Sequence, residues 1–133
     1  MDKRIDVIAT AMRGGIRADE LMDLELAYAP PFSSAKDPVN MLGYIADNRI
    51  NHNVKSVQWS ELAAEVAAGA TLLDVRTQWE TSRGTIPGAL QIPLNDLRER
   101  VGELPAGGRV IVYCRVGHTA HTATMLLSSL GFD

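Results

Sequence analysis

The sequence predicts an α/β fold, in which helices flank a parallel sheet and a helical appendage precedes it. Two features carry this prediction. After residue 53, short apolar runs alternate with amphipathic segments, the pattern of strands that are connected by helices in a parallel sheet. Before that point, the apolar residues recur at helical spacing. The polar segment Asn51-His52-Asn53 separates the two regions. We therefore expect a boundary between residues 1–52 and residues 53–133.

Composition excludes several classes of protein. The chain has 133 residues, a hydrophobic fraction of 46% and a net charge of −3. An acidic balance argues against a nucleic-acid-binding protein, which usually carries a basic face. No apolar run approaches the ~20 residues that span a bilayer. The first residues contain acidic side chains and do not resemble a signal peptide. We expect a cytoplasmic protein with no membrane partner and no nucleic-acid partner.

The first region contains three expected helices, over residues 5–12, 19–24 and 37–46. Asp37 is placed to cap the third helix, because Pro38 suits the first helical position and aspartate is a preferred N-cap. The prolines at 30–31 exclude a helix in the preceding segment. No catalytic chemistry can be derived for this region from its residues alone.

The second region alternates between the two kinds of element. We expect strands at 57–59, 71–76, 90–93 and 110–113, and helices at 60–69, 95–104 and 120–130. Ser60 and Asn95 are placed to cap the first two of these helices. Pro87-Gly88 marks a turn within residues 84–89, and Gly131 suits the end of the last helix.

Cys114 is the single cysteine, so it can form neither an internal disulfide nor a CxxC redox pair. It stands where the clearest strand meets the last helix, and ligands bind beyond the carboxyl ends of parallel strands. The loop after it leads into a helix N-terminus, whose N–H groups and dipole favour thiolate over thiol. Gly117 suits a backbone with positive φ. The alternative is a buried structural cysteine, since free cysteines are often buried.

Four motifs extend this argument to a known family. In order they are Leu73-Asp74-Val75-Arg76, Gly84-Thr85-Ile86-Pro87-Gly88-Ala89, Ile92-Pro93-Leu94 and Val112-Tyr113-Cys114-Arg115-Val116-Gly117. From about Ser56 onward, the chain resembles rhodanese-homology domains. The resemblance implies that Cys114 takes a sulfane sulfur from a donor as a persulfide and passes it to a thiol acceptor. It also implies an active-site loop made of Arg115, Val116, Gly117, His118 and Thr119.

The resemblance assigns a supporting role to Asp74 and Arg76, which organise the site in that family. It also implies a further strand after Asp133, inside the sheet, which this chain lacks. Two positions depart from the family pattern. Thr119 stands where many members have an arginine that holds an anionic donor, and Thr85 replaces a common histidine. We therefore expect a donor other than a small anion such as thiosulfate.

Two other kinds of site could be built from a cysteine loop of this type, a phosphatase site and a metal site. Cysteine phosphatases need an arginine six residues after the cysteine to clamp phosphate, and that residue here is Ala120. A metal site made of Cys114, His118 and His121 would need three ligands from one loop to bend around the ion. We expect neither a phosphatase nor a metal centre.

The segment from Asp23 to Tyr44 resembles the C-terminal end of the dimerisation domain of CoA-disulfide reductases and NADH-dependent persulfide reductases. The resemblance implies FAD, NADH and CoA for a parent reductase, and a homodimer. It places Tyr44 near the substrate of the partner subunit, although a partly buried helix-face aromatic is the simpler interpretation here. The dinucleotide-binding glycine fingerprint is absent from this chain, so we expect no cofactor in it.

The first hypothesis is therefore sulfur transfer through a Cys114 persulfide, in concert with a flavin-dependent and NADH-dependent CoA-disulfide or persulfide reductase. The alternative is a weak or inactive rhodanese-like module used for docking or regulation. Thr119 and the missing strand favour the alternative, and the intact Cys114 favours the first hypothesis. A third interpretation is that the first fifty residues only mediate self-association.

Overall fold

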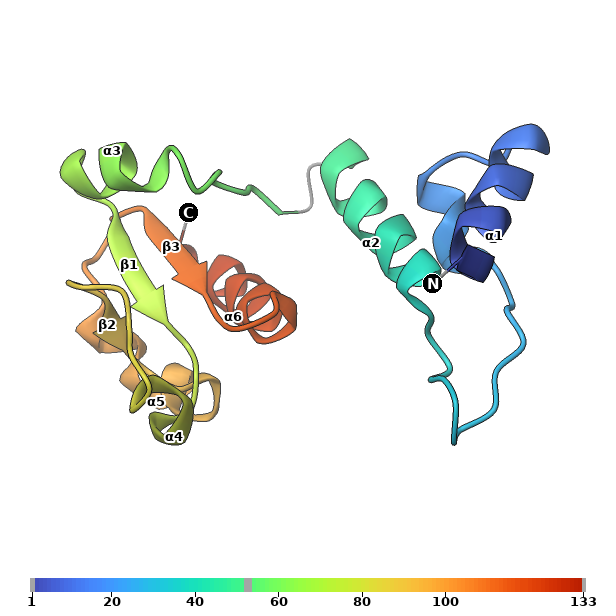
Figure 1. Cartoon of the computed structure of the whole chain (residues 1–133). Coiled ribbons are helices and arrows are strands. Elements are labelled where there is room, and N and C mark those ends of the chain that lie inside the picture. Colours follow the sequence, from blue (N-terminus) through green and yellow to red (C-terminus); the bar gives the residue numbers. More distant parts are fainter. Residues whose placement is uncertain (1, 52–53, 133) are drawn as a thin grey trace. The chain divides into compact units, whose positions relative to one another are not determined.

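The computed structural model describes residues 2–51 and 54–132, which form two compact units, Met1–Lys55 and Ser56–Asp133 (Figure 1). Most of the expected boundary, His52 and Asn53, lies outside the described residues. No helix among the described residues is long and apolar enough to cross a membrane.

The N-terminal unit consists of α1 (Asp2–Arg13), η1 (Asp19–Asp23) and α2 (Pro38–Ile50), at the three expected places. The second is a 3-10 helix. Asp37 caps α2 as expected: its carboxylate accepts the Val39 N–H at 3.0 Å, and its own N–H donates to the Asn40 side chain at 3.0 Å. Arg4 of α1 also binds the Asp37 carboxylate through Nε, at 2.9 Å. This residue therefore starts one helix and ties it to another.

The core of this unit is small, and it includes a buried amide. Ala11, Leu21 and Val39 pack together, and Asn40 is fully buried beside them. The Asn40 amide donates to the carbonyl groups of Leu21, Met22 and Leu24, at 3.1, 3.4 and 2.9 Å. These carbonyls lie at or just after the end of η1, where the last carbonyls of a helix need partners from outside it; the Leu21 carbonyl also accepts the Leu24 N–H, at 3.5 Å. Asn40 thus fastens α2 to η1.

The C-terminal unit contains the expected parallel sheet. Its described strands are β1 (Thr71–Asp74), β2 (Leu90–Gln91) and β3 (Val110–Tyr113), in the order β2-β1-β3 (Figure 1). The register pairs Asp74 with Tyr113 and with Gln91, so the carboxyl ends of the strands lie together. The prediction of an α/β fold with a parallel sheet is confirmed.

Short helices surround the sheet: α3 (Leu62–Ala67), α4 (Gln78–Thr81), η2 (Leu94–Asp96), α5 (Leu97–Arg100), η3 (Val101–Glu103) and α6 (His118–Ser129). The core joins Leu73 and Val75 to Leu97, Ala123 and Leu127. Both α5 and α6 thus contribute to one core with β1. The burial of these apolar side chains is the main favourable term for this unit.

Four expectations about elements are wrong: among them, Asn95 lies within η2 and caps no helix, since α5 has Asp96 at its N-cap position. Residues 57–59 form no strand, because a turn takes their backbone: the Gln58 N–H donates to the Glu61 carboxylate, and the Glu61 N–H to the Gln58 carbonyl, each at 2.9 Å. Ser60 caps no helix, since α3 begins later with Glu61 at its N-cap position. The expected helix 95–104 is split into η2, α5 and η3, with Gly102 lowering the helix propensity of its last part.

β3 lies at one edge of the described sheet. Among the described residues, β3 pairs only with β1. The strand that the family resemblance places after Asp133 lies outside the described residues, so its position beside β3 stays a prediction. The last helix and its stop are as expected, because α6 ends just before Gly131, whose φ is 86°.

Candidate functional site

Cys114 immediately follows β3, at the carboxyl edge of the sheet. Val110, Val112 and Cys114 all pack against the core that α6 shares, as expected for side chains that alternate along a strand. The sulfur therefore lies on the α6 face of the sheet. The loop can turn into α6 at once because Gly117, the N-cap residue, has a φ of 92°, a conformation that other residues rarely adopt.

Two backbone N–H groups point at the sulfur. The Gly117 N–H donates to Sγ at 3.2 Å and the Ala120 N–H at 3.3 Å. Both belong to the start of α6, where the first N–H groups have no partner within the helix and the helix dipole is positive. Among the described residues, no side chain donates to Sγ, so these amides form the polar surroundings of the sulfur. Such an arrangement favours a negative charge there.

The loop side chains lie mostly in solvent. Arg115, Val116, Gly117 and His118 are exposed, and Thr119 is half-buried as the second residue of α6. Val116 is 76% exposed, so an apolar side chain stands at the rim of the site. The expected loop is therefore divided between residues 115–117, which precede the helix, and the first two residues of α6. Its exposed side chains are available for contacts with other molecules.

Asp74 and Arg76 form a tight pair at the end of β1. Arg76 Nη2 lies 2.7 Å from Asp74 Oδ2, Arg76 Nε lies 2.9 Å from Oδ1, and the Arg76 N–H also donates to Oδ1 at 3.1 Å. Asp74 is fully buried. Burial alone would raise the pKa of the Asp74 carboxyl, but the hydrogen bonds, led by those from Arg76, hold it below its usual range. The pair is thus a fixed ionic support beside the strand that carries Cys114.

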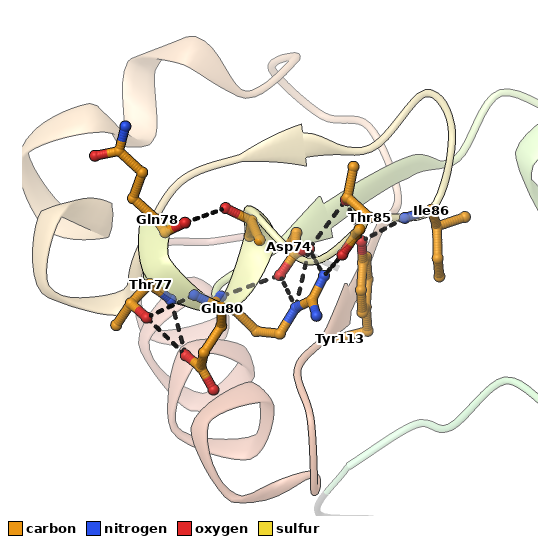
Figure 2. A network of polar contacts seen from close by, with 10 residues as sticks. Asp74, Thr77, Gln78, Glu80, Thr85, Ile86 and Tyr113 are labelled. Carbon is orange, nitrogen blue, oxygen red and sulfur yellow. Dashed lines mark hydrogen bonds and ion pairs between the residues drawn. The ribbon is translucent and has the colours of Figure 1, made fainter.

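The support extends to two hydroxyl groups that sequence analysis did not assign. Thr85 Oγ1 lies 3.1 Å from Asp74 Oδ2 and 2.8 Å from the Tyr113 hydroxyl (Figure 2). The Ile86 N–H donates to the same Tyr113 hydroxyl at 3.2 Å. Tyr113 was part of a quoted motif, but nothing in its local sequence pointed to a partner 28 residues earlier. The parallel register pairs Asp74 with Tyr113, and the turn that contains Thr85 and Ile86 lies against both of them.

A short helix, α4, also lies close to this end of the sheet, and the sequence analysis did not anticipate it. Thr77 caps it in a capping box with Glu80, whose carboxylate accepts the Thr77 N–H at 3.0 Å (Figure 2). This hydrogen bond is the main reason that the pKa of Glu80 is lowered, and the positive charges of Arg115 and Arg76 contribute. The Thr-x-x-Glu spacing was the signal that could have predicted this helix.

The remaining residues that the sequence singled out are Tyr44, His118 and His121. Tyr44 belongs to the N-terminal unit, on α2, with the Lys36 ammonium 5.8 Å from its ring centroid. His118 and His121 are both exposed on α6. Within residues 2–51 and 54–132, no three metal-ligating side chains come together.

The fold and the site define a class: parallel α/β domains that present a cysteine at the N-terminus of a helix. Within this class, the family of rhodanese-like domains matches residues 58–133. The chain therefore belongs to the rhodanese-like domain family.

Relatives extend the likeness to both units. The crystal structure of reduced Bacillus anthracis CoADR-RHD shares 45% identity and a TM-score of 0.93, over 99% of this chain and 24% of that chain. An NAD-dependent persulfide reductase from A. fulgidus shares 34% identity and a TM-score of 0.80, over 98% of this chain and 23% of that one. A coenzyme A disulfide reductase of Staphylococcus aureus is 54% identical over 46 residues, which are 35% of this chain and 10% of the relative. The chain thus spans a quarter or less of the length of these relatives.

Proposed function

We propose that this chain transfers sulfane sulfur through a persulfide on Cys114. The observation that carries the proposal is the pair of N–H groups, from Gly117 and Ala120, that meet the sulfur at 3.2 and 3.3 Å. They favour the thiolate, which is the nucleophilic form of cysteine. The exposed loop leaves room for a donor to approach.

The proposed reaction has two balanced steps. The Cys114 thiolate attacks the outer sulfur of a sulfane donor, a new Sγ–S bond forms, and the bond to the rest of the donor breaks. The leaving group departs with the electron pair, as a thiolate if the donor is a persulfide. An acceptor thiolate then attacks the terminal sulfur, and the Cys114 thiolate is restored. The terminal negative charge of the intermediate stays beside the N–H groups at the start of α6.

Mass spectrometry tests the proposal directly. The chain is treated with a sulfane donor and digested, and the peptide that contains Cys114 should gain the mass of one sulfur atom, which a thiol acceptor then removes. Because Cys114 is the single cysteine, the variant Cys114→Ser provides a clean control. An unmodified Cys114 that still reacts with an alkylating agent would contradict sulfur transfer. That result would favour the alternative, a rhodanese-like module for docking or regulation.

We also propose that the chain works with a flavin-dependent and NADH-dependent reductase that handles CoA disulfides or persulfides. The names of two relatives, a coenzyme A disulfide reductase and an NAD-dependent persulfide reductase, support the reductase part of this proposal, and the flavin is what the family resemblance implies. The described residues do not fit FAD or NADH, because the turn after β1, Val75-Arg76-Thr77, has no glycine for close approach of a pyrophosphate. FAD and NADH would bind to other domains of a reductase.

The surface of the N-terminal unit fits a role as one part of a larger assembly. It exposes large apolar side chains on α1 and α2, namely Ile5, Met12, Met41, Leu42, Ile45 and Ile50. Large exposed apolar surfaces often mark protein–protein interaction sites. We propose that reductase domains, in a homodimer, cover this surface and place Tyr44 near their substrate. Sedimentation of the chain with and without a separately produced reductase portion tests this. A chain that stays monomeric and does not bind that portion would contradict it.

A further inference from the structure

The side chain of Tyr113 lies on the face of the strand opposite to the Cys114 sulfur, and it helps to hold the backbone there. It directly precedes Cys114, and successive side chains of a strand point to opposite faces. Cys114 packs toward the core with Val112, so Tyr113 faces the other way. The Tyr113 carbonyl accepts the Val75 N–H at 3.2 Å. The peptide that joins Tyr113 to Cys114 is therefore held by the sheet and also by the contacts of the Tyr113 side chain.

The hydroxyl of that side chain belongs to an ordered chain of hydrogen bonds. Asp74 is ionised and can only accept, because its pKa is lowered. The single hydroxyl proton of Thr85 must therefore point at Asp74 Oδ2, 3.1 Å away. Tyr113 must then donate to Thr85 Oγ1, at 2.8 Å, while it accepts the Ile86 N–H at 3.2 Å. The direction runs from Ile86 through Tyr113 and Thr85 to Asp74 (Figure 2).

The ring of Tyr113 is held as well. The Arg76 guanidinium lies 5.6 Å from the ring centroid, within the range of a cation–π contact. Arg76 Nη2 also donates to the Gly84 carbonyl at 2.9 Å. Three consecutive residues, 84–86, are thus tied to the Asp74–Arg76 pair or to Tyr113. The network joins this turn, the end of β1 and the end of β3.

We infer that Tyr113 is a positioning residue for Cys114. Its hydroxyl, acting through Thr85, fixes the base of the cysteine loop and so holds Sγ within reach of the Gly117 and Ala120 N–H groups. Among the described residues, Tyr113 makes no hydrogen bond to the sulfur, so it acts through the position of the backbone. Its importance for turnover rests on the proposed function, but its effect on the reactivity of the sulfur does not.

The test uses variants that remove one hydroxyl each. Tyr113→Phe and Thr85→Val break the chain of hydrogen bonds, and Thr85→Ser keeps its hydroxyl. Thr81→Val is the matched control, because the Thr81 hydroxyl only donates to the Gln78 carbonyl within α4, at 3.1 Å. The rate of alkylation of Cys114 by iodoacetamide is measured across neutral and alkaline pH, and the stability of each variant is measured alongside. The single cysteine makes the alkylation signal unambiguous.

Tyr113→Phe and Thr85→Val each remove a hydroxyl that makes two hydrogen bonds. Each should slow alkylation at neutral pH by roughly two- to tenfold, the range expected if the net contribution of one typical hydrogen bond reaches the sulfur. The pH profile of the rate should move to higher pH. The double variant should be no slower than either single variant, because both break the same chain. Thr85→Ser and Thr81→Val should match the wild type.

Two results would overturn the inference. Unchanged alkylation with reduced stability would make the network purely structural, and additive effects in the double variant would mean that the two hydroxyls act separately. Should Tyr113→Phe fail to fold, the comparison of Thr85→Val with Thr85→Ser still decides. Sulfur loading is measured in parallel, with a lower kcat and an unchanged KM for the donor expected. A wild type that alkylates as described but takes up no sulfur would refute the proposed function and leave this inference standing.

Discussion

Replacing Asp74 with asparagine should destabilise the C-terminal unit strongly. The change keeps the shape of the side chain and removes its charge. Asp74 is fully buried, and it accepts hydrogen bonds from three Arg76 donors and from Thr85. Arg76 is itself only 17% exposed, so its positive charge would be left largely without compensation. Removing one partner of a buried ion pair costs about 3–5 kcal/mol.

The expected loss is somewhat smaller than that full range. The asparagine carbonyl can still accept one of the Arg76 bonds, and Arg76 keeps some contact with water. We therefore expect the free energy of unfolding to fall by about 2–4 kcal/mol, given that one hydrogen bond to a charged group contributes ~1.5–3 kcal/mol. Domains are stable by only ~5–15 kcal/mol, so the loss should be easily measured.

The pH dependence gives a second check. The pKa of Asp74 is lowered in the folded protein relative to the unfolded value of about 3.9. Because the folded-state pKa is lowered, the contribution of the Asp74 carboxylate to stability is complete above the unfolded pKa. It is lost as the pH falls through the folded-state pKa. The difference in the free energy of unfolding between the wild type and Asp74→Asn should therefore be constant near neutral pH and shrink below about pH 4.

Urea denaturation, followed by tryptophan fluorescence, measures the stability of the C-terminal unit. Both tryptophans, Trp59 and Trp79, belong to that unit. Asp96→Asn is the control, since Asp96 is exposed and its side chain makes no hydrogen bond within the described part of the chain. A loss below about 1 kcal/mol for Asp74→Asn, the value of an ordinary surface ion pair, would refute the argument. A difference that does not change in acid would refute its electrostatic basis.

Three further changes have definite expected outcomes. Gly43→Ala should cost the N-terminal unit about 3 kcal/mol or more, by thermal unfolding, because its Cβ would lie 2.1 Å from the Met22 backbone nitrogen; Gly102→Ala, in open space, is the control. Thr77→Ala should cost about 1 kcal/mol in urea denaturation, because it removes the cap of α4; no loss would mean that the cap is dispensable. Thr119→Arg should raise thiosulfate turnover through tighter apparent donor binding, since arginine can grip an anion with paired donors. Unchanged turnover, with Cys114 reactive, would mean that the missing arginine does not limit donor use.

Elements with a strong local pattern were predictable from the sequence. The run at 110–113 is continuous and apolar, and Leu72-Leu73 gives the strand at 71–74 an apolar centre. The last helix, α6, has a regular apolar stripe. Asp37-Pro38 fixed the start of α2 because the cap and the proline act within one turn. The same reasoning failed at 57–59. A short apolar run forms a strand only when another strand offers it hydrogen bonds, and here the Glu61 carboxylate takes the Gln58 N–H.

The site divides in the same way. The position of Cys114 follows from one strand, one loop and one helix, so adjacent residues suffice to predict it. The network that supports it depends on Asp74, Thr85 and Tyr113, which lie on two strands and a turn. On sequence alone, Thr85 counts as a loss, because it replaces a histidine. In the structure its hydroxyl donates to Asp74 and accepts from Tyr113, both at once, which a hydroxyl can do because it is donor and acceptor together. A departure from a family pattern is therefore evidence of lost function only after the partners of the new side chain are known. Here those partners depend on the register that pairs Asp74 with Tyr113 and on the turn that brings Thr85 to them.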